Sequence, residues 1–397
     1  NHTKLHFADL PPELISEIAN RLTNYSDYVR ARCVCKAWES AIPRRPAKLL
    51  RSLPLLLLPY HQNVSDHRGL FSILDEKPYL LKLPETRGKH CCGSSNGWLI
   101  LVHDTPEISL LNPLTRRRID LPTLTTLNNF PTELIFQNAM SLCESFIHRE
   151  KLHVRDTFVA KAVLSGDPST SKDAVAVIIY GSSQNLAWCK PGDRSWTPVG
   201  NISHCSDVVF HQGKLYAVDK TGNVFAGELT GTMAMVADAP ASSGEVQWYL
   251  TNSNGLTLLS RHRRVGPGYK YKTERFDIYR MDKGQKWRKM VDVAEKAIFV
   301  GLGGSHSVDA GDYAGIAGNA VYFTDDFMRV DNDFVWEGHD YGVYDFRYGC
   351  VKSVDFSVPM YPMERPDPPS LFFYDHSMHR DTSVFLMPPP IWVTISP

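Results

Sequence analysis

The sequence predicts an α+β chain in which a small all-α module at the N-terminus precedes a large all-β propeller. Three observations support this fold class. Apolar residues recur with helical spacing only in the first fifty residues. After them, short apolar runs alternate with Gly, Asn, Asp and Pro turns. The length of 397 residues suits one small domain beside one large domain.

The helical pattern begins at two consecutive prolines, which a helix tolerates only in its first turn. The apolar positions 14, 15, 18 and 22 then fall on one face of a helix. A second helix is predicted from Ser26 or Asp27 to about Ile42, and Pro43 ends it. Such a small module cannot bury a sufficient core alone, so we expect it to pack on the rest of the chain or on a partner.

The module also carries a known motif. Its residues are Leu10-Pro11-x-Glu13-Leu14, Ile18, Arg21-Leu22, Asp27, Arg30, Arg32 and Val34-Cys35-Lys36-x-Trp38. In this order and spacing, residues 5–45 resemble an F-box. The resemblance implies docking onto a Skp-type adaptor, which links to a cullin in a ubiquitin ligase. We expect adaptor contacts from Leu10, Pro11, Leu14, Ile15, Ile18, Leu22, Val29, Val34 and Trp38. The alternative is a helical cap on the chain's own C-terminal domain.

Two units recur after residue 58. In the first, a Gly-containing turn opens an apolar strand, at residues 96–101, 213–219, 254–259 and 318–323. In the second, a strand and a turn lead to an aromatic or basic strand, at residues 186–196 and 276–287 and more loosely at 108–116 and 343–349. These units predict about six irregular, kelch-like propeller blades, with five or seven as alternatives.

Within each blade, we expect the Gly-led strand to line the channel and the aromatic residue to pack between blades. One blade is expected to combine strands near residues 70–84 with the C-terminus, because closure by both ends removes free sheet edges.

The strand-rich region resembles a second family. The motifs are Gly97-Trp98-Leu99, Asn112-Pro113-Leu114-Thr115, Gly192-Asp193-x-Ser195-Trp196, Tyr322-Phe323-Thr324-Asp325-Asp326 and Pro388-Pro389-Pro390-Ile391-Trp392. They are similar to those of plant F-box proteins with a KIB-type, propeller-like domain, which is thought to hold a degradation target. We therefore divide the chain into an F-box at residues 5–45, a linker at 46–64 and a target-recognition propeller at 65–397.

Three patterns that could indicate enzymatic or metal chemistry are incomplete. Residues 300–307 contain three glycines but lack the helix and the acidic residue of a dinucleotide fingerprint, so we expect a blade turn with positive φ. Ser305, His306 and Asp309 include the residue types of a catalytic triad, but no nucleophile elbow is present. His90-Cys91-Cys92 and Cys33-x-Cys35 lack the spacing of a zinc site.

Two charged patterns are interpreted as surface features. The acidic residues at 325, 326, 331 and 333 are expected to form a solvated loop with capped turns. The basic runs at 116–118 and 261–264 are expected on a solvated face or at a hairpin end.

Lys+Arg and Asp+Glu each number 43, so no overall charge steers the chain to nucleic acid or to an anionic membrane. We expect no cofactor, no catalytic residue and no metal. Without a signal peptide, the cysteines are expected to be reduced, in the cytoplasm and/or nucleus.

The sequence thus predicts a non-catalytic subunit of a Skp–cullin–F-box ubiquitin ligase that binds a Skp-type adaptor, through it a cullin, and an unknown protein target. Two alternatives stay open. One is an F-box scaffold without a ligase role, and the other is a propeller enzyme or small-molecule binder with a helical cap.

Overall fold

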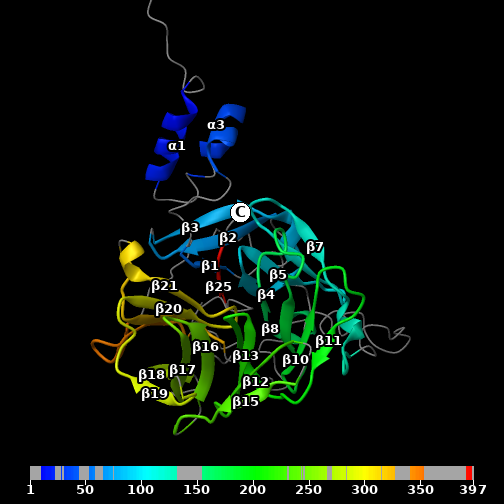
Figure 1. Cartoon of the computed structure of the whole chain (residues 1–397), viewed down its shortest axis with the longest axis vertical. Helices are drawn as coiled ribbons and strands as arrows, with labels where there is room; N and C mark the ends of the chain where they lie inside the picture. Colours follow the sequence, from blue (N-terminus) through cyan, green and yellow to red (C-terminus); the bar gives the residue numbers. More distant parts are fainter. Residues whose placement is uncertain are drawn as a thin grey trace, which may run out of the picture.

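The computed structural model describes two regions, a helical module and a β-propeller. The described residues are 10–22, 28, 31–43, 53–58, 66–74, 76–131, 154–229, 232–242, 244, 246–265, 271–282, 284–313, 315–326, 340–352 and 390–395. In this part of the chain, six sheets surround a common axis, and the helices α1 and α3 are drawn beyond one edge of the ring (Figure 1). The predicted fold class, with about six blades, is confirmed.

The helical module contains α1 (Pro12–Arg21) and α3 (Lys36–Ala41). Pro12 occupies the first turn of α1, where its missing N–H group leaves no intrahelical bond unmade. The predicted single helix from residue 26 or 27 to Ile42 is wrong. Cys35 has an extended backbone (φ −164°, ψ 172°), so the helical hydrogen bonds stop before it and start again in α3.

We number the blades along the chain. Blade 1 contains β1 (Leu55–Leu57), β2 (His67–Ser72), β3 (Lys77–Lys82) and β25 (Ile391–Val393). Blade 2 contains β4 (His90–Ser95), β5 (Trp98–Val102), β6 (Ile108–Leu111) and β7 (Arg118–Asp120). Blade 3 contains β8 (Val159–Leu164), β9 (Ala176–Tyr180), β10 (Asn185–Cys189) and β11 (Thr197–Val199).

Blade 4 contains β12 (Cys205–His211), β13 (Lys214–Asp219), β14 (Val224–Gly227) and β15 (Ala234–Ala237). Blade 5 contains β16 (Val246–Asn252), β17 (Leu256–Val265), β18 (Tyr271–Met281) and β19 (Trp287–Met290). Blade 6 contains β20 (Lys296–Val300), β21 (His306–Asp309), β22 (Ala320–Phe323), β23 (Gly342–Asp345) and β24 (Cys350–Lys352). Blade 6 is irregular, because β20 pairs with β22 in parallel.

The innermost strands form the wall of the axis. β4 contacts both β25 and β8, and β12 contacts both β8 and β16, which in turn contacts β21. The Gly-led strands β5, β13 and β17 are the second strands of their blades, so the expectation that they line the channel is wrong. Their glycines instead supply the positive φ of the turn from the first strand to the second, as at Gly97 (φ 81°) and Gly213 (φ 78°).

Blade 1 is closed by strands from distant parts of the chain. β25 pairs with β1 in the register Leu55↔Val393, Leu56↔Trp392 and Leu57↔Ile391. The prediction of a blade shared with the C-terminus is therefore confirmed. The predicted linker at residues 46–64 contains β1, so the propeller starts before residue 65, because these three leucines are the partner that β25 needs.

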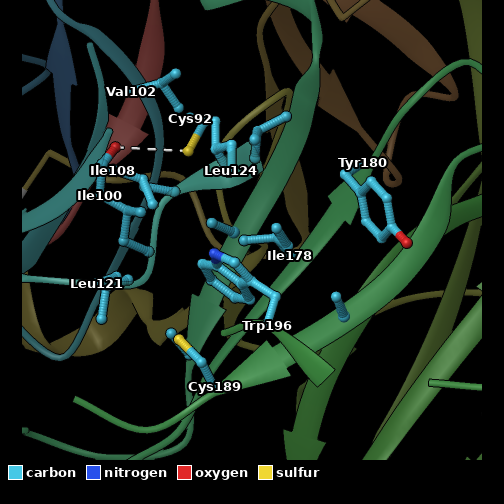
Figure 2. Close-up of a cluster of buried hydrophobic side chains, with 14 of the residues drawn as sticks. Cys92, Ile100, Val102, Ile108, Leu121, Leu124, Ile178, Tyr180, Cys189 and Trp196 are labelled. Atoms are coloured by element: carbon cyan, nitrogen blue, oxygen red, sulfur yellow. Dashed lines mark hydrogen bonds between the residues drawn. The ribbon is translucent and has the colours of Figure 1, made fainter. Parts of the chain in front are cut away.

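The hydrophobic core lies between neighbouring blades. Figure 2 shows the cluster of blades 2 and 3, in which Trp196 and Ile178 share one core with Leu121 and Ile100. The Trp196 indole N–H also donates to the Pro122 carbonyl oxygen at 2.8 Å. The predicted packing of an aromatic residue between blades is thus confirmed for Trp196.

Candidate functional site

The residues predicted to bind the adaptor fall into two groups, and the first is internal. Ile15 is fully buried and Trp38 is 6% exposed. Both lie in a cluster with Ala19, Tyr28 and Ile42. The prediction that Ile15 and Trp38 offer their side chains to a partner therefore needs correction, because they form the core of the module.

Hydrogen bonds fix this core. The Ser16 hydroxyl on α1 donates to the Ala41 carbonyl oxygen on α3 at 2.9 Å. The Tyr28 hydroxyl donates to the Pro43 carbonyl oxygen at 2.8 Å, and burial raises the pKa of Tyr28. The two helices are thus held together without a partner.

The second group is exposed. Leu14 is 52% exposed, Ile18 is 37% exposed and Val34 is 55% exposed, although all three side chains are large and apolar. Leu14 and Ile18 lie one turn apart on α1, so their side chains share a face. We call these three residues the exposed apolar face. Contiguous exposed apolar side chains, such as Leu14 and Ile18, are typical of interaction surfaces.

The other predicted contact residues have intermediate positions. Leu10 and Leu22 are half-buried against the module's core, and Pro11 is exposed. Val29 lies outside the described residues. The sequence placed Leu14, Ile15, Ile18 and Leu22 on one face. These positions span about 100° of the helix surface, the usual width of a core-facing stripe, so the spacing alone carries no signal that separates the buried residues from the exposed ones.

The propeller contains a buried ionic network that the sequence did not indicate. The Arg261 guanidinium on β17 is fully buried and donates to the Asp326 carboxylate at 3.1 Å and to the Asp340 carboxylate at 3.0 Å. It also donates to the Thr324 carbonyl oxygen at 2.8 Å and to the Tyr249 hydroxyl at 3.2 Å. The network therefore joins blade 5 to both ends of the connection between β22 and β23 of blade 6.

Further contacts complete this network. Arg263 also pairs with the Asp326 carboxylate, and the Thr273 hydroxyl donates to Asp340 at 2.7 Å. The Arg261 guanidinium lies 4.6 Å from the centroid of the Phe323 ring. Burial alone would raise the pKa of Asp326, but Arg263 and Arg261 hold this pKa below its ordinary value. The cluster is electrically balanced and hydrogen-bonded, as a buried ionic cluster must be.

These contacts overturn two predictions about charged segments. Asp325 is buried and the Asp326 side chain is 4% exposed, so they do not form a solvated loop, and the acidic positions 331 and 333 lie outside the described residues. In the basic run at 261–264, Arg261 and His262 are buried and only Arg264 is well exposed. The run at 116–118 is exposed and leads into β7, as predicted for a hairpin end.

The candidate nucleophiles have structural partners. The Ser305 hydroxyl is bonded to Asp207, and the Ser260 hydroxyl lies 3.1 Å from His262 Nε2. Asp277 binds that same Nε2 atom, at 3.0 Å, whereas a catalytic triad needs the two groups on different ring nitrogens. Burial raises the pKa of the Cys91 thiol to about 11, which disfavours the reactive thiolate.

The described residues contain no group of three or more His, Cys, Asp or Glu side chains that could hold a metal ion. Within the same ranges, no helix has the length and apolar character needed to cross a membrane.

The glycines of residues 300–307 are required because neighbouring atoms leave too little space for a side chain. Gly301, Gly303 and Gly304 do not have positive φ, so the prediction of a turn that needs it is wrong. A Cβ atom on Gly301 would lie 2.1 Å from the Thr324 hydroxyl oxygen. The strand β21 follows them, which excludes the helix of a dinucleotide fingerprint.

Comparison with known families agrees with both regions. A model described as the KIB1-4 beta-propeller matches residues 70–345, and one described as F-box-like matches residues 7–46. The chain belongs to the KIB1-4 beta-propeller family. The exposed apolar face lies wholly within the F-box-like segment.

The chain is similar to several proteins of Arabidopsis thaliana. "F-box protein At2g26160" is 25% identical over 82% of this chain and 97% of its own length. "F-box protein SKIP23" is 23% identical over 98% of this chain and 95% of its own length. "F-box/kelch-repeat protein KIB1" is 25% identical over 86% of this chain and 84% of its own length. Plant proteins named for an F-box are thus similar to this chain over most of its length.

Proposed function

We propose that this chain is the target-recognition subunit of a Skp–cullin–F-box ubiquitin ligase. The helical module docks a Skp-type adaptor and through it a cullin, and the propeller binds a protein target. The observation that supports this most is the exposed apolar face, Leu14, Ile18 and Val34, on a module whose own core is already formed.

The energetics of docking are favourable. Complete burial of one large apolar side chain contributes about 1.5–3 kcal/mol. The three side chains are 37–55% exposed, so burying what remains exposed contributes roughly half of that amount for each. Leu10 and Leu22, half-buried at the edge of the core, extend the contact, whereas Ile15 and Trp38 support it from within.

In this proposal the subunit is not catalytic. The ligation chemistry belongs to partner subunits, and the chain raises the effective concentration of target lysines near the conjugating enzyme. A ligase subunit with this role works in the cytoplasm and/or nucleus, where its partners are found.

The test is calorimetric binding of the purified chain to a purified Skp-type adaptor. We expect Leu14→Asp to weaken binding at least about 100-fold, because it places a charge in an apolar contact. Met235→Asp is the matched control, since Met235 on β15 is 54% exposed, nearly the same as Leu14. It should bind as the wild type does.

The outcomes separate the alternatives. No binding by a folded wild-type chain would contradict adaptor docking, and equal binding by Leu14→Asp would place the contact elsewhere. Adaptor binding without recovery of a cullin in the assembled complex would favour an F-box scaffold over a ligase subunit.

A further inference from the structure

The loop of residues 301–305, which we call the axial loop, links β20 to β21 in blade 6 but contacts blades 1 and 2 at one end and blade 4 at the other. Leu302 packs in the hydrophobic cluster between blades 1 and 2, which includes Leu57 and Leu99. The Ser305 hydroxyl donates to the Asp207 carboxylate of blade 4 at 2.8 Å. Blades 1 and 4 face each other in a six-bladed ring, so the axial loop crosses the axis.

The glycines of the axial loop allow this crossing. A Cβ atom on Gly303 would lie 3.0 Å from the Trp392 carbonyl oxygen of β25. A Cβ atom on Gly304 would lie 3.1 Å from the Ser94 carbonyl oxygen of β4. Both distances are shorter than ordinary van der Waals contact, so at these two positions the loop passes the innermost strands of blades 1 and 2 too closely for a side chain.

At its far end the axial loop joins a polar hub centred on Asp207, whose carboxylate is fully buried. This carboxylate also accepts a hydrogen bond from Lys161 Nζ of blade 3 at 2.8 Å and from the Leu250 N–H group of blade 5 at 3.0 Å. Blades 3, 4, 5 and 6 therefore meet at one carboxylate. A buried charge with this many donors is stable only while all of them stay in place.

The strand that precedes the axial loop, β20, holds β25, the three-residue strand that completes blade 1. The Trp392 indole N–H donates to the Val300 carbonyl oxygen at 3.1 Å, and the Trp392 ring lies 5.0 Å from the Phe299 ring. Just beyond β25, the Thr394 N–H group donates to the Ser94 hydroxyl at 3.1 Å. The backbone pairing of β25 with β1 is thus reinforced from blades 6 and 2.

We propose that the axial loop is an internal latch, which crosses the axis of the propeller and couples the closure of blade 1 by β25 to the Asp207 hub. In this proposal the axial loop occupies the centre of the ring. A ligand that entered along the axis would have to displace the loop. Blade 1 opens first when the latch is disturbed.

Hydrogen exchange of the full chain, followed by mass spectrometry, tests the latch. Gly303→Ala presses a methyl group against β25, and Ser305→Ala removes the bond to Asp207 without adding volume. For both variants we expect exchange at residues 53–58 and 391–395 to accelerate at least about tenfold, with β9 and β10 of blade 3 unchanged. Gly166→Ala is the control, because nothing lies within 4 Å of its added Cβ.

Two results would overturn the proposal. One is an equal acceleration in all six blades, which would make the loop a general stability element. The other is unchanged exchange at β25 in the folded variants. If Gly303→Ala does not fold, the same readout from Ser305→Ala decides.

Discussion

The helical module and the propeller differ in which side chains they bury and which they expose. Among its described residues, the module has a core of five buried side chains and leaves Leu14, Ile18 and Val34 exposed to solvent. The propeller buries apolar side chains in the interfaces between its blades and also buries the charged network around Arg261. The helical module, which we propose to dock a partner, thus leaves apolar side chains exposed to solvent. The propeller instead buries charged side chains, which hold its blades in a fixed arrangement.

The largest expected effect comes from the charged network. Arg261→Met should destabilise the propeller by about 3–5 kcal/mol, because it leaves Asp326 and Asp340 short of a buried partner. Urea denaturation followed by tryptophan fluorescence measures this loss.

The matched control is Arg118→Met, which removes an exposed ion pair with Asp120. Exposed pairs contribute about 0–1 kcal/mol, so this variant should unfold close to the wild type. A similar loss in both variants would show that burial does not set the strength of the Arg261 network.

A smaller and local effect is expected in the module. Trp38→Ala should cost about 3 kcal/mol, because it removes the largest side chain of a small core. Hydrogen exchange should then show α1 and α3 unprotected and the propeller strands unchanged. If the helices of Trp38→Ala stay protected from exchange, Trp38 is not needed for the core. Leu14→Asp serves as the comparison, because it should leave both helices protected.

The smallest effect concerns acidification and should be confined to the propeller. Burial lowers the pKa of His90 and of His306 from 6.5 to about 4. Between these values the unfolded chain binds more protons than the folded chain, so stability is lost as the pH falls from about 6.5 toward 4. Each histidine contributes a slope of at most about 1.4 kcal/mol per pH unit.

Denaturation at pH 7, 6 and 5 measures this slope. His306→Asn should flatten it, and His211→Gln, at a partly exposed position on β12, should leave it unchanged. An identical slope in the wild type and in His306→Asn would show that His306 does not contribute to the loss of stability at low pH.

The blades could be predicted because their signals are local. A Gly-led turn and a turn followed by Trp196 or Trp287 each lie within about a dozen residues, so the sequence shows them directly. The F-box motif is local in the same sense. Closure by the C-terminus followed from the physical need to pair a free edge.

The charged network could not be predicted because its partners are distant in the sequence. Arg261 and Asp340 are 79 residues apart, and neither segment alone differs from a solvated charged run. The module shows the same limit. Helical spacing placed Leu14 and Ile15 on one stripe, and only the position of α3 decides that Ile15 is buried and Leu14 is not.

The late position of β25 in the chain has a consequence for biosynthesis. A ribosome makes the helical module, β1 and β2 first, so β1 can pair with β2 early, but its other edge lacks a partner until residues 391–393 have emerged. Until then, that edge of β1 is unpaired and able to associate with another chain. A product of premature termination would therefore carry the helical module on a ring that cannot close.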